Sequence, residues 1–385
     1  MKVLHVSPSF HPAGHYGGPI YSGYRLCNSE VELPNIELKV LTTDSDGPKR
    51  IRVDEIPTRL PEGYDVFYCR RWLQPDLAPE MLLRLPSLIR WSDVVHLTSV
   101  YSASTIPTLL FCRLYRKPVV WSTRGALQRW EGSTRTTIKR IWERLCNSLC
   151  NPERVVLHVT SEAERLDSVK RIPNALAVVI PNGIELSESW VQLPRKHAEL
   201  RILYLGRLHP IKGIENLLRA FPLLKTEARL SICGEGDLAY QKQLQSLAHE
   251  LGLNGRVKFH GRVGGEAKEQ QFEESDLCVV PSFKENFCIV VAEALARGVP
   301  VVASRGTPWQ RLVEMGCGLW VDNTSEELAK AIDSAASLPL KEMGQRGRAW
   351  MGEEYSWQTI AERMVGQYGS LIEASASGQS RIAVA

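Results

Sequence analysis

Short apolar runs rich in Val and Ile alternate with segments of helical periodicity along most of the chain. In the second half, residues 201–205 form such a run, and the segment after it places apolar side chains on one helix face: Ile214, Leu217, Leu218, Phe221 and Leu224. The pattern continues with predicted strands at 229–233, 257–261, 276–282 and 300–304 and predicted helices at 240–253, 266–275 and 284–298. This alternation predicts a parallel sheet covered by helices on both faces, with ligands bound beyond the carboxyl ends of its strands.

The first half repeats the pattern less regularly. Its apolar runs predict strands at 2–7, 37–43, 93–99, 118–123, 155–161 and 177–183. A polar, proline-containing stretch at 187–200 separates the halves, so we expect two doubly wound α/β domains, residues 1–190 and 198–354, facing one another across a cleft. The small, polar residues of 374–385 predict a disordered tail.

Composition excludes several classes of protein. The 385 residues are 44% hydrophobic with a formal net charge of +4, which fits a globular protein and gives no sign of nucleic-acid binding. The nine cysteines include no C-x-x-C pair, and no leader precedes the first predicted strand, so we expect free thiols in the cytoplasm. The apolar runs fall short of the ~20 residues that a membrane-spanning helix needs.

Two cations follow the predicted strand at 201–205. Arg207 and Lys212 belong to the stretch GRLHPIKG, which lies where a parallel sheet binds its ligands. Arg offers a planar fork to phosphate oxygens and Lys a mobile point charge, so together they suit a diphosphate and could neutralise a leaving group. A solvated surface loop would explain the same two residues.

Two glutamates flank the start of the helix predicted near Phe287. Glu285 precedes it and Glu293 lies inside it, within about 12 Å of one another at 1.5 Å per residue. The N–H groups of Phe287, Cys288 and Ile289 could bind a diphosphate between them, with sugar hydroxyls on one carboxylate and ribose hydroxyls on the other. The apolar neighbours of Glu293 make an unpaired carboxylate there costly, which favours a ligand over a plain surface helix.

These stretches together resemble glycosyltransferase family 4, whose members are retaining enzymes of the GT-B fold, and the resemblance covers nearly the whole chain. The paired glutamates are its signature, and GRLHPIKG resembles its phosphate-binding loop. By the same resemblance Gly234 lies in a glycine turn, Arg262 and Val263 contact the base, and Gly17 and Gly18 form a glycine loop that approaches the donor diphosphate. The family also implies a final helix, at 355–373, that returns to the first domain.

Two positions depart from the family pattern. Arg124 stands where a His is common; because Arg cannot act as a base, we expect it to bind acceptor or phosphate. Cys288 stands where Gly is common, so its side chain narrows the space beside the sugar, unless it is simply a small buried residue. His96 ends a predicted strand, and we interpret it as a packed, hydrogen-bonded histidine in preference to an acceptor contact.

The resemblance implies transfer of a sugar from a UDP- or GDP-sugar to a hydroxyl acceptor with retention of configuration. Arg207, Lys212 and Glu285 would be the catalytic residues, and no cofactor or metal is expected because no metal-ligand cluster is visible. Two alternatives stay open: a sugar-nucleotide 2-epimerase of the same fold, and a non-catalytic protein that binds nucleotide sugars.

The stretch from Arg129 to Arg144 carries five basic and two acidic residues in a nearly neutral chain. Ile138, Ile141, Trp142 and Leu145 fall on one face of the predicted helix, which could lie on an anionic membrane surface or pack on its own domain. Its place in the expected acceptor domain favours the membrane. We therefore predict a peripheral enzyme on the inner face of the cell membrane that extends a lipid-linked or surface-polysaccharide glycan.

Overall fold

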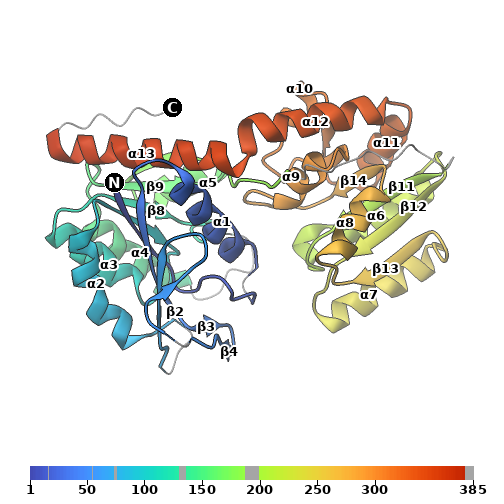
Figure 1. The fold of residues 1–385 in the computed structure, drawn as a ribbon. Helices are drawn as coiled ribbons and strands as arrows, with labels where there is room; N and C mark the ends of the chain where they lie inside the picture. Colours follow the sequence, from blue (N-terminus) through green and yellow to red (C-terminus); the bar gives the residue numbers. More distant parts are fainter. Residues whose placement is uncertain (16, 54, 73–75, 130–135, 187–198, 378–385) are drawn as a thin grey trace. The chain divides into compact units, whose positions relative to one another are not determined.

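The computed structural model describes residues 1–385 except 16, 54, 73–75, 130–135, 187–198 and 378–385. The chain divides into two compact units (Figure 1): residues 1–183 with 357–385, and residues 184–356. The predicted linker at 187–200 falls almost wholly outside the described residues. None of the helices in the described ranges is long and apolar enough to cross a bilayer.

The first unit contains a parallel sheet with one antiparallel edge strand. In the order β10-β9-β8-β7-β1-β2-β6-β5 the strands are Leu176–Val179, Val155–Val159, Val119–Ser122, Val94–Thr98, Lys2–Val6, Glu37–Thr43, Asp65–Cys69 and Thr58–Arg59. A hairpin of β3 (Ser45–Asp46) and β4 (Lys49–Arg50) stands apart from it. Its helices are α1 (Gly18–Glu32), α2 (Pro79–Trp91), α3 (Thr105–Leu114), α4 (Thr136–Leu149), α5 (Glu162–Arg171) and α13 (Trp357–Ser377).

Both faces of the first sheet are buried. Successive residues of a strand join opposite cores, as Val94 packs with the residues of α13 and Val95 with those of α2 and α3. Helix α13 contacts α1 along the same face, and Figure 1 shows the two lying together there. The buried strands therefore read as nearly continuous apolar runs, as predicted for a parallel sheet.

The predicted tail begins too early. Helix α13 continues to Ser377 because its last turn is held by the first unit: Arg154 Nη2 donates to the carbonyl of Ser375 at 3.0 Å, and Ser375 Oγ donates to the carbonyl of Glu153 at 3.1 Å. Residues 374–377 are thus helical, and the rest of the predicted tail lies outside the described residues.

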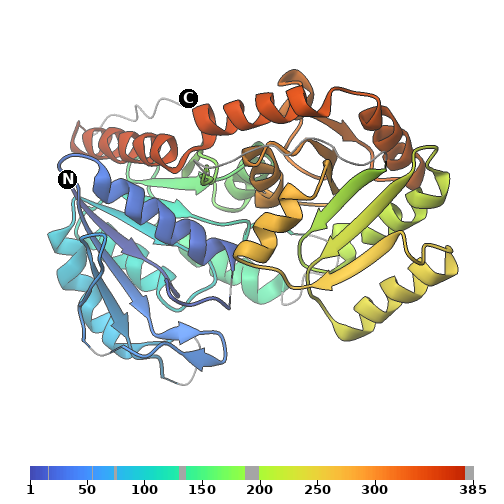
Figure 2. The same ribbon diagram turned by 45° about the vertical axis from the view of Figure 1, so that its right-hand side comes forward.

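The second unit contains a six-stranded, wholly parallel sheet. In the order β13-β12-β11-β14-β15-β16 the strands are Val257–Gly261, Ala228–Cys233, Leu200–Leu205, Leu277–Val280, Val301–Ser304 and Gly318–Val321. Its helices are α6 (Ile214–Ala220), α7 (Leu238–Glu250), α8 (Glu266–Glu273), α9 (Ile289–Ala296), α10 (Arg311–Glu314), α11 (Ser325–Ala336) and α12 (Leu340–Tyr355). Figure 2 shows these strands side by side, with α7 in yellow along one edge.

The strand order of the second sheet fixes where a ligand can bind. The chain moves outward from β11 to β12 and β13, then returns to place β14 on the other side of β11 and continues outward to β16. The loops that follow β11 and β14 therefore diverge at the centre of the sheet. This reversal is the topological switch point at which open α/β sheets bind ligands.

Candidate active site

The two loops at the switch point carry the predicted catalytic residues. The loop after β11 contains Arg207 and ends in a single 3-10 turn, Pro210–Lys212. The loop after β14 contains Glu285 and leads into α9. The strand order thus brings together two sequence segments about 70 residues apart, as the sequence predicted for the ends of neighbouring strands.

Lys212 and Glu285 form an ion pair across the switch point. Lys212 Nζ donates to Glu285 Oε1 at 2.5 Å, and Ser282 Oγ donates to the same oxygen at 2.7 Å. The two side chains are 21% and 12% exposed, so the pair is shielded yet open to a ligand. A phosphate arriving here would compete for the ammonium group with a carboxylate that is already in place.

Backbone contacts hold these loops in a fixed arrangement. The N–H of Phe283 donates to the carbonyl of Ile211 at 2.8 Å, and the N–H of Glu285 donates to that of Gly306 at 2.8 Å. Gly213 has φ 64°, and a Cβ there would lie 2.1 Å from the carbonyl oxygen of Pro281. Glycine is therefore required where the loops meet, and the Glu285 loop is fixed on both sides.

Arg207 lies in the same loop as Lys212, five residues before it, and its side chain is exposed. The hydroxyl of Tyr204 donates to the Arg207 carbonyl at 3.1 Å; burial raises the pKa of Tyr204 well above its usual range, with the charge of Glu285 adding to the effect. Gly234 packs against this loop so closely that a Cβ would lie 1.8 Å from the carbonyl oxygen of Gly206. Gly234 thus has a packing role that the sequence did not reveal.

The helix after Glu285 begins later than predicted. Helix α9 starts at Ile289, because Cys288 adopts a left-handed conformation with φ 61° and turns the chain into the helix. The N–H of Val291 donates to the carbonyl of Cys288 at 3.1 Å. The donors at this helix end are therefore those of Ile289 and Val290, and Phe287 lies outside it.

The premise that Glu293 lacks a protein partner is wrong. Lys268 of α8 donates to Glu293 Oε1 at 2.6 Å, and the two side chains are 25% and 15% exposed. Arg297 of the following turn pairs with Glu269 of α8 at 2.5 Å. This pair of bridges between α8 and α9 gives Glu293 a structural role and removes the argument that its burial requires a ligand.

Three other predicted residues of this unit lie apart from the ion pair. Phe287 is buried, its ring is tilted against that of Trp309 with ring centroids 5.3 Å apart, and its carbonyl accepts a hydrogen bond from Trp309 Nε1. Arg262 and Val263 follow β13, the edge strand; the Arg262 side chain is exposed and Val263 is partly buried on the core. All three occupy the carboxyl-end side of the sheet, but Phe287 serves the core.

In the first unit, Gly17 and Gly18 stand at the start of α1, after β1. Gly17 has φ 61°, which favours glycine for its backbone conformation. Arg124, with φ 50°, contacts two elements through Nη1, which donates to Asn182 Oδ1, after β10, at 2.5 Å and to Ser22 Oγ, on α1, at 3.4 Å. Its Nε is buried without a partner among the described residues, and burial lowers the pKa of Arg124, which stays charged.

His96 belongs to a buried polar network, as expected. Its Nδ1 shares a hydrogen bond with the hydroxyl of Tyr368 at 2.5 Å, and its Nε2 shares one with Ser122 Oγ at 2.7 Å. The Tyr368 hydroxyl also donates to Glu30 Oε1 at 2.7 Å, and Glu30 Oε2 is 2.7 Å from His5 Nε2. The hydrogen bonds thus join β1, β7, β8 and α1 to the final helix, α13.

Four side chains with central contacts were not predicted. Ser282 could have been predicted, because it lies three residues before Glu285 and at the end of a predicted strand. Tyr204 and Lys268 gave no signal, because their contacts depend on how the loop after β11 folds and how α8 packs on α9. In the first unit Glu164, fully buried, accepts from Thr123 Oγ1 at 2.7 Å and from the N–H of Gly125 at 2.5 Å, fixing the loop that carries Arg124.

Two family models match adjoining parts of the chain. The model described as glycosyltransferase family 4 matches residues 32–188, and that described as glycosyl transferases group 1 matches residues 188–350. An uncharacterised glycosyltransferase of Methanocaldococcus jannaschii is 27% identical over 335 residues, 81% of this chain and 77% of that protein. The D-inositol 3-phosphate glycosyltransferase of an Arthrobacter species is 25% identical over an alignment 424 positions long, which covers 96% of this chain and 94% of the relative.

Solved structures share the fold over the whole length. Sucrose-phosphate synthase of Thermosynechococcus elongatus has a TM-score of 0.71 at 21% identity, covering 97% of this chain and 99% of that one. HepE of Anabaena, solved with UDP, has a TM-score of 0.72 at 20% identity, covering 96% and 100%. The protein is therefore a glycosyltransferase of the two-domain GT-B class. Its residues 32–188 are similar to glycosyltransferase family 4, and its residues 188–350 are similar to the group 1 glycosyl transferases.

Proposed function

We propose that this enzyme transfers a sugar from a UDP- or GDP-sugar to a hydroxyl of a lipid-linked or surface-polysaccharide glycan, with retention of anomeric configuration. The observation that carries the proposal is the Lys212–Glu285 pair at the switch point of the second sheet, with an exposed Arg207 in the same loop as Lys212. A cation and a carboxylate side by side suit the two halves of a nucleotide sugar, its diphosphate and its sugar hydroxyls.

The similar proteins support this choice of substrates. HepE of Anabaena has been solved with UDP, with UDP and glucose, and with UDP-glucose. A lipopolysaccharide 1,2-N-acetylglucosaminetransferase of Salmonella typhimurium is 28% identical over 221 residues, which is 50% of this chain and 56% of that protein. Two structural neighbours, WaaG and WaaB, are lipopolysaccharide glycosyltransferases.

In the proposed reaction the bond from the anomeric carbon to the diphosphate breaks while the acceptor oxygen attacks from the same face. The leaving phosphate takes the acceptor proton, so no side-chain base is needed. Arg207 and Lys212 stabilise the negative charge that develops on the phosphate, and Glu285 accepts hydrogen bonds from the sugar. Glu293, Ile289 and the Arg262–Val263 segment would hold the nucleoside and phosphate groups, and turnover is expected to persist in EDTA.

Replacement of one lysine tests the proposal. Lys212→Ala should lower kcat by about 10²–10³-fold, because the leaving group loses a preorganised cation. Lys330→Ala is the matched control, since Lys330 is an exposed lysine of the same unit that pairs with Glu327 at 2.8 Å. Undiminished turnover in Lys212→Ala would overturn the assignment of this site.

The same assay separates the transferase from the other two functions. Incubation with UDP- or GDP-sugars alone should yield no new sugar nucleotide, whereas an epimerised sugar nucleotide would assign a 2-epimerase. Formation of a glycosidic product with a glycan acceptor would exclude a protein that only binds nucleotide sugars.

We also propose that α4 rests on an anionic membrane surface. Ile138, Ile141 and Leu145 are 64%, 54% and 51% exposed, and the cations Arg140 and Arg144 lie on the adjacent exposed face. Trp142 does not belong to this stripe, contrary to the prediction: it packs on the core, and its Nε1 donates to the carbonyl of Val100 at 2.7 Å. Of the predicted basic stretch, residues 130–135 lie outside the described ranges.

Co-sedimentation with vesicles tests this placement. The enzyme should pellet with vesicles rich in phosphatidylglycerol at low salt and less at high salt, since its cations are exposed. Changing Lys139, Arg140 and Arg144 to Ser should weaken the binding. A protein that stays in the supernatant under these conditions would point to a soluble acceptor.

A further inference from the structure

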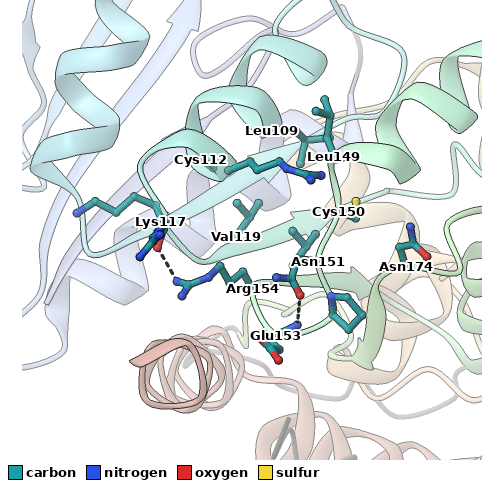
Figure 3. Close-up of a pocket in the computed structure, with 14 residues that line it drawn as sticks. Leu109, Cys112, Lys117, Val119, Leu149, Cys150, Asn151, Glu153, Arg154 and Asn174 are labelled. Carbon is teal, nitrogen blue, oxygen red and sulfur yellow. Dashed lines mark hydrogen bonds between the residues drawn. The ribbon is translucent and has the colours of Figure 1, made fainter. Parts of the chain in front are cut away.

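A pocket of about 570 Å³ opens at the amino-terminal edge of the first sheet. Its lining includes Val119 and Val155, the first residues of β8 and β9, together with residues from the ends of α3 and α4 (Figure 3). The switch-point residues follow the carboxyl ends of strands in the other unit. The pocket is therefore separate from the proposed donor site.

Four cations line this pocket: Arg113, Arg116, Lys117 and Arg154. They converge from three places, the last turn of α3, the segment entering β8 and the segment entering β9, and the lining contains one carboxylate, that of Glu153. In Figure 3, Lys117 and Arg154 lie toward one end of the pocket and Asn174 toward the other. A second hollow of about 480 Å³ is also lined by Arg116, Lys117 and Arg154, so these three cations border both hollows.

Three of these cations are held in place without being neutralised. Arg113 Nη1 donates to the carbonyl of Ser148 at 2.5 Å and Lys117 Nζ to that of Ser92 at 2.5 Å. Arg154 donates to the carbonyls of Arg116 and Ser375 at 2.7 and 3.0 Å. Within the described residues none of the four forms an ion pair. Each Arg fork therefore keeps N–H donors for an anion.

Cations near a helix end commonly complement its dipole, and three of these side chains donate to a carbonyl at such an end: Arg113 at the end of α4, Lys117 at the end of α2 and Arg154 at the end of α13. The partial charge of a helix end, equivalent to roughly half an elementary charge, does not offset the full charges of a lining with four cations against one acid. Like charges brought together repel, so their convergence on one pocket favours an anionic ligand. Phosphate is the anion that several Arg and Lys side chains suit best.

The surroundings of the pocket favour a lipid as the source of that phosphate. Leu110 and Leu114 of α3 are 49% and 67% exposed, and they flank Arg113 on the helix. Helix α3 packs against α4, whose exposed Ile138, Ile141 and Leu145 were described above. Exposed apolar side chains beside a phosphate site would meet the acyl region of a lipid whose headgroup fills the pocket.

We propose that this pocket binds the phosphate of an anionic membrane lipid, with Arg113, Arg116, Lys117 and Arg154 as its donors. The proposal deepens the proposed membrane association of α4 and rests on it for the lipid. The pocket would add a defined headgroup contact to the general attraction of exposed cations for a charged surface. Lipids with a phosphate and net negative charge would be preferred over zwitterionic ones.

Calorimetric titration of the full chain with soluble short-chain lipids tests the pocket without vesicles. Dihexanoyl phosphatidylglycerol, kept below its micelle concentration, should bind at least tenfold more tightly than dihexanoyl phosphatidylcholine and than inorganic phosphate. The double variant Arg113→Ser/Arg116→Ser should lose at least tenfold in affinity for phosphatidylglycerol. Both side chains are exposed, so the variant should keep the melting temperature of the parent.

Arg140→Ser/Arg144→Ser is the matched control, since it removes two exposed cations of α4 outside the pocket. It should weaken vesicle binding while leaving the affinity for soluble phosphatidylglycerol within twofold. If the Arg113/Arg116 variant binds phosphatidylglycerol as tightly as the parent does, the pocket is not the binding site. If the parent binds inorganic phosphate as tightly as phosphatidylglycerol, the ligand is not a lipid. Stabilisation by UDP should be the same in both variants, so failure of the pocket would leave the transferase proposal standing.

Discussion

Glu285 is the residue whose role is most sharply defined by its contacts. It accepts from Lys212 and from Ser282 on one oxygen, Oε1, and its backbone is fixed by Gly306. A neutral amide of the same shape can keep the Ser282 contact but no longer neutralises the lysine. The carboxylate therefore restrains Lys212 and, in the proposed reaction, holds the sugar.

Glu285→Gln separates these two roles. We expect kcat to fall by about 10²-fold or more, because the sugar loses a charged acceptor. The Kd for UDP or GDP should stay within threefold of the parent or decrease, since Lys212 is released for the diphosphate. Calorimetry on the nucleotide beside steady-state kinetics measures both. A large loss of nucleotide affinity without loss of kcat would contradict the assignment.

Cys288 occupies a backbone conformation that suits glycine. With φ 61° a side chain there is strained by about 1–2 kcal/mol, and a β-branched one by more. We expect Cys288→Gly to retain the stability of the parent and Cys288→Val to lose at least 2 kcal/mol, as measured by urea unfolding. Cys278→Val, in the extended backbone of β14, is the control and should be tolerated better. Equal losses for the two valine variants would contradict the strain argument.

Residue types and spacing predicted the Lys212–Glu285 region because both residues belong to loops that follow buried strands. They could not predict the left-handed turn at Cys288, since a single dihedral angle leaves no trace in hydrophobic periodicity. The pairing of Glu293 with Lys268 was missed for a related reason: it depends on how two helices pack, 25 residues apart in sequence. The sequence thus indicated that these two loops share a site, but it did not indicate which side chains pair between helices.

Among the elements, α13 has the most consequential contacts. Its Tyr368 hydroxyl meets both His96 and the carboxylate of Glu30, which is fully buried. We expect Tyr368→Phe to lower the free energy of unfolding of the first unit by about 2–3 kcal/mol, because a buried carboxylate loses a donor. Tyr115→Phe is the control, since the Tyr115 hydroxyl only accepts from exposed Arg90. Equal effects in urea unfolding would argue against the buried network.

The histidines of β7 and β9 predict a pH dependence. Burial, with the nearby Arg124, lowers the pKa of His158 to about 3, and burial lowers that of His96 well below its usual range. In the unfolded chain both side chains have a pKa of about 6.5. Below that pH the unfolded state binds protons that the folded state does not, so stability falls as the pH decreases towards 3.

The slope of this dependence can be measured. Each histidine contributes roughly 1.4 kcal/mol per pH unit across the window, so urea-unfolding midpoints of the first unit should fall between pH 6.5 and 4.5. In His158→Gln the free energy of unfolding should change less steeply with pH, by about the contribution of one histidine, even if the variant is less stable than the parent at pH 7. An unchanged slope would show that His158 titrates alike in both states.

The sequence predicted the elements of the second unit through β15 but not β16, α10, α11 and α12. Strands such as β11 and β14 are continuous apolar runs between clear helices. In the first unit β6 and the hairpin β3–β4 were missed, since short strands between polar loops give little periodicity. The end of α13 was placed four residues early, because small polar residues such as Ser375 are held by contacts with Arg154 and Glu153.

At the scale of the whole molecule, the chain leaves its first unit after residue 183 and re-enters it at Trp357. Deletion of residues 357–385 should therefore unfold the first unit and leave the second folded, although the deleted residues lie next to the second unit in sequence. Limited proteolysis with mass spectrometry should return a resistant core within 184–356. The substitution Glu362→Ala, on the exposed side of α13, is the control and should leave both units resistant. If the deletion variant yields no resistant core from either unit, the division of the chain into two units is contradicted.

The two-part construction of the first unit also has a consequence for biosynthesis. When the strands of its sheet leave the ribosome, one face is covered by α1 but not yet by α13: Val3, Val94, Val120 and Val156 pack with residues of α13, which are made only after the whole second unit. At about 5–20 residues per second, the intervening stretch takes roughly 10 to 40 seconds to synthesise. During that time the second unit can finish folding while the earlier one stays incomplete. In the cell, the nascent first unit is thus the part of this enzyme that most needs a chaperone.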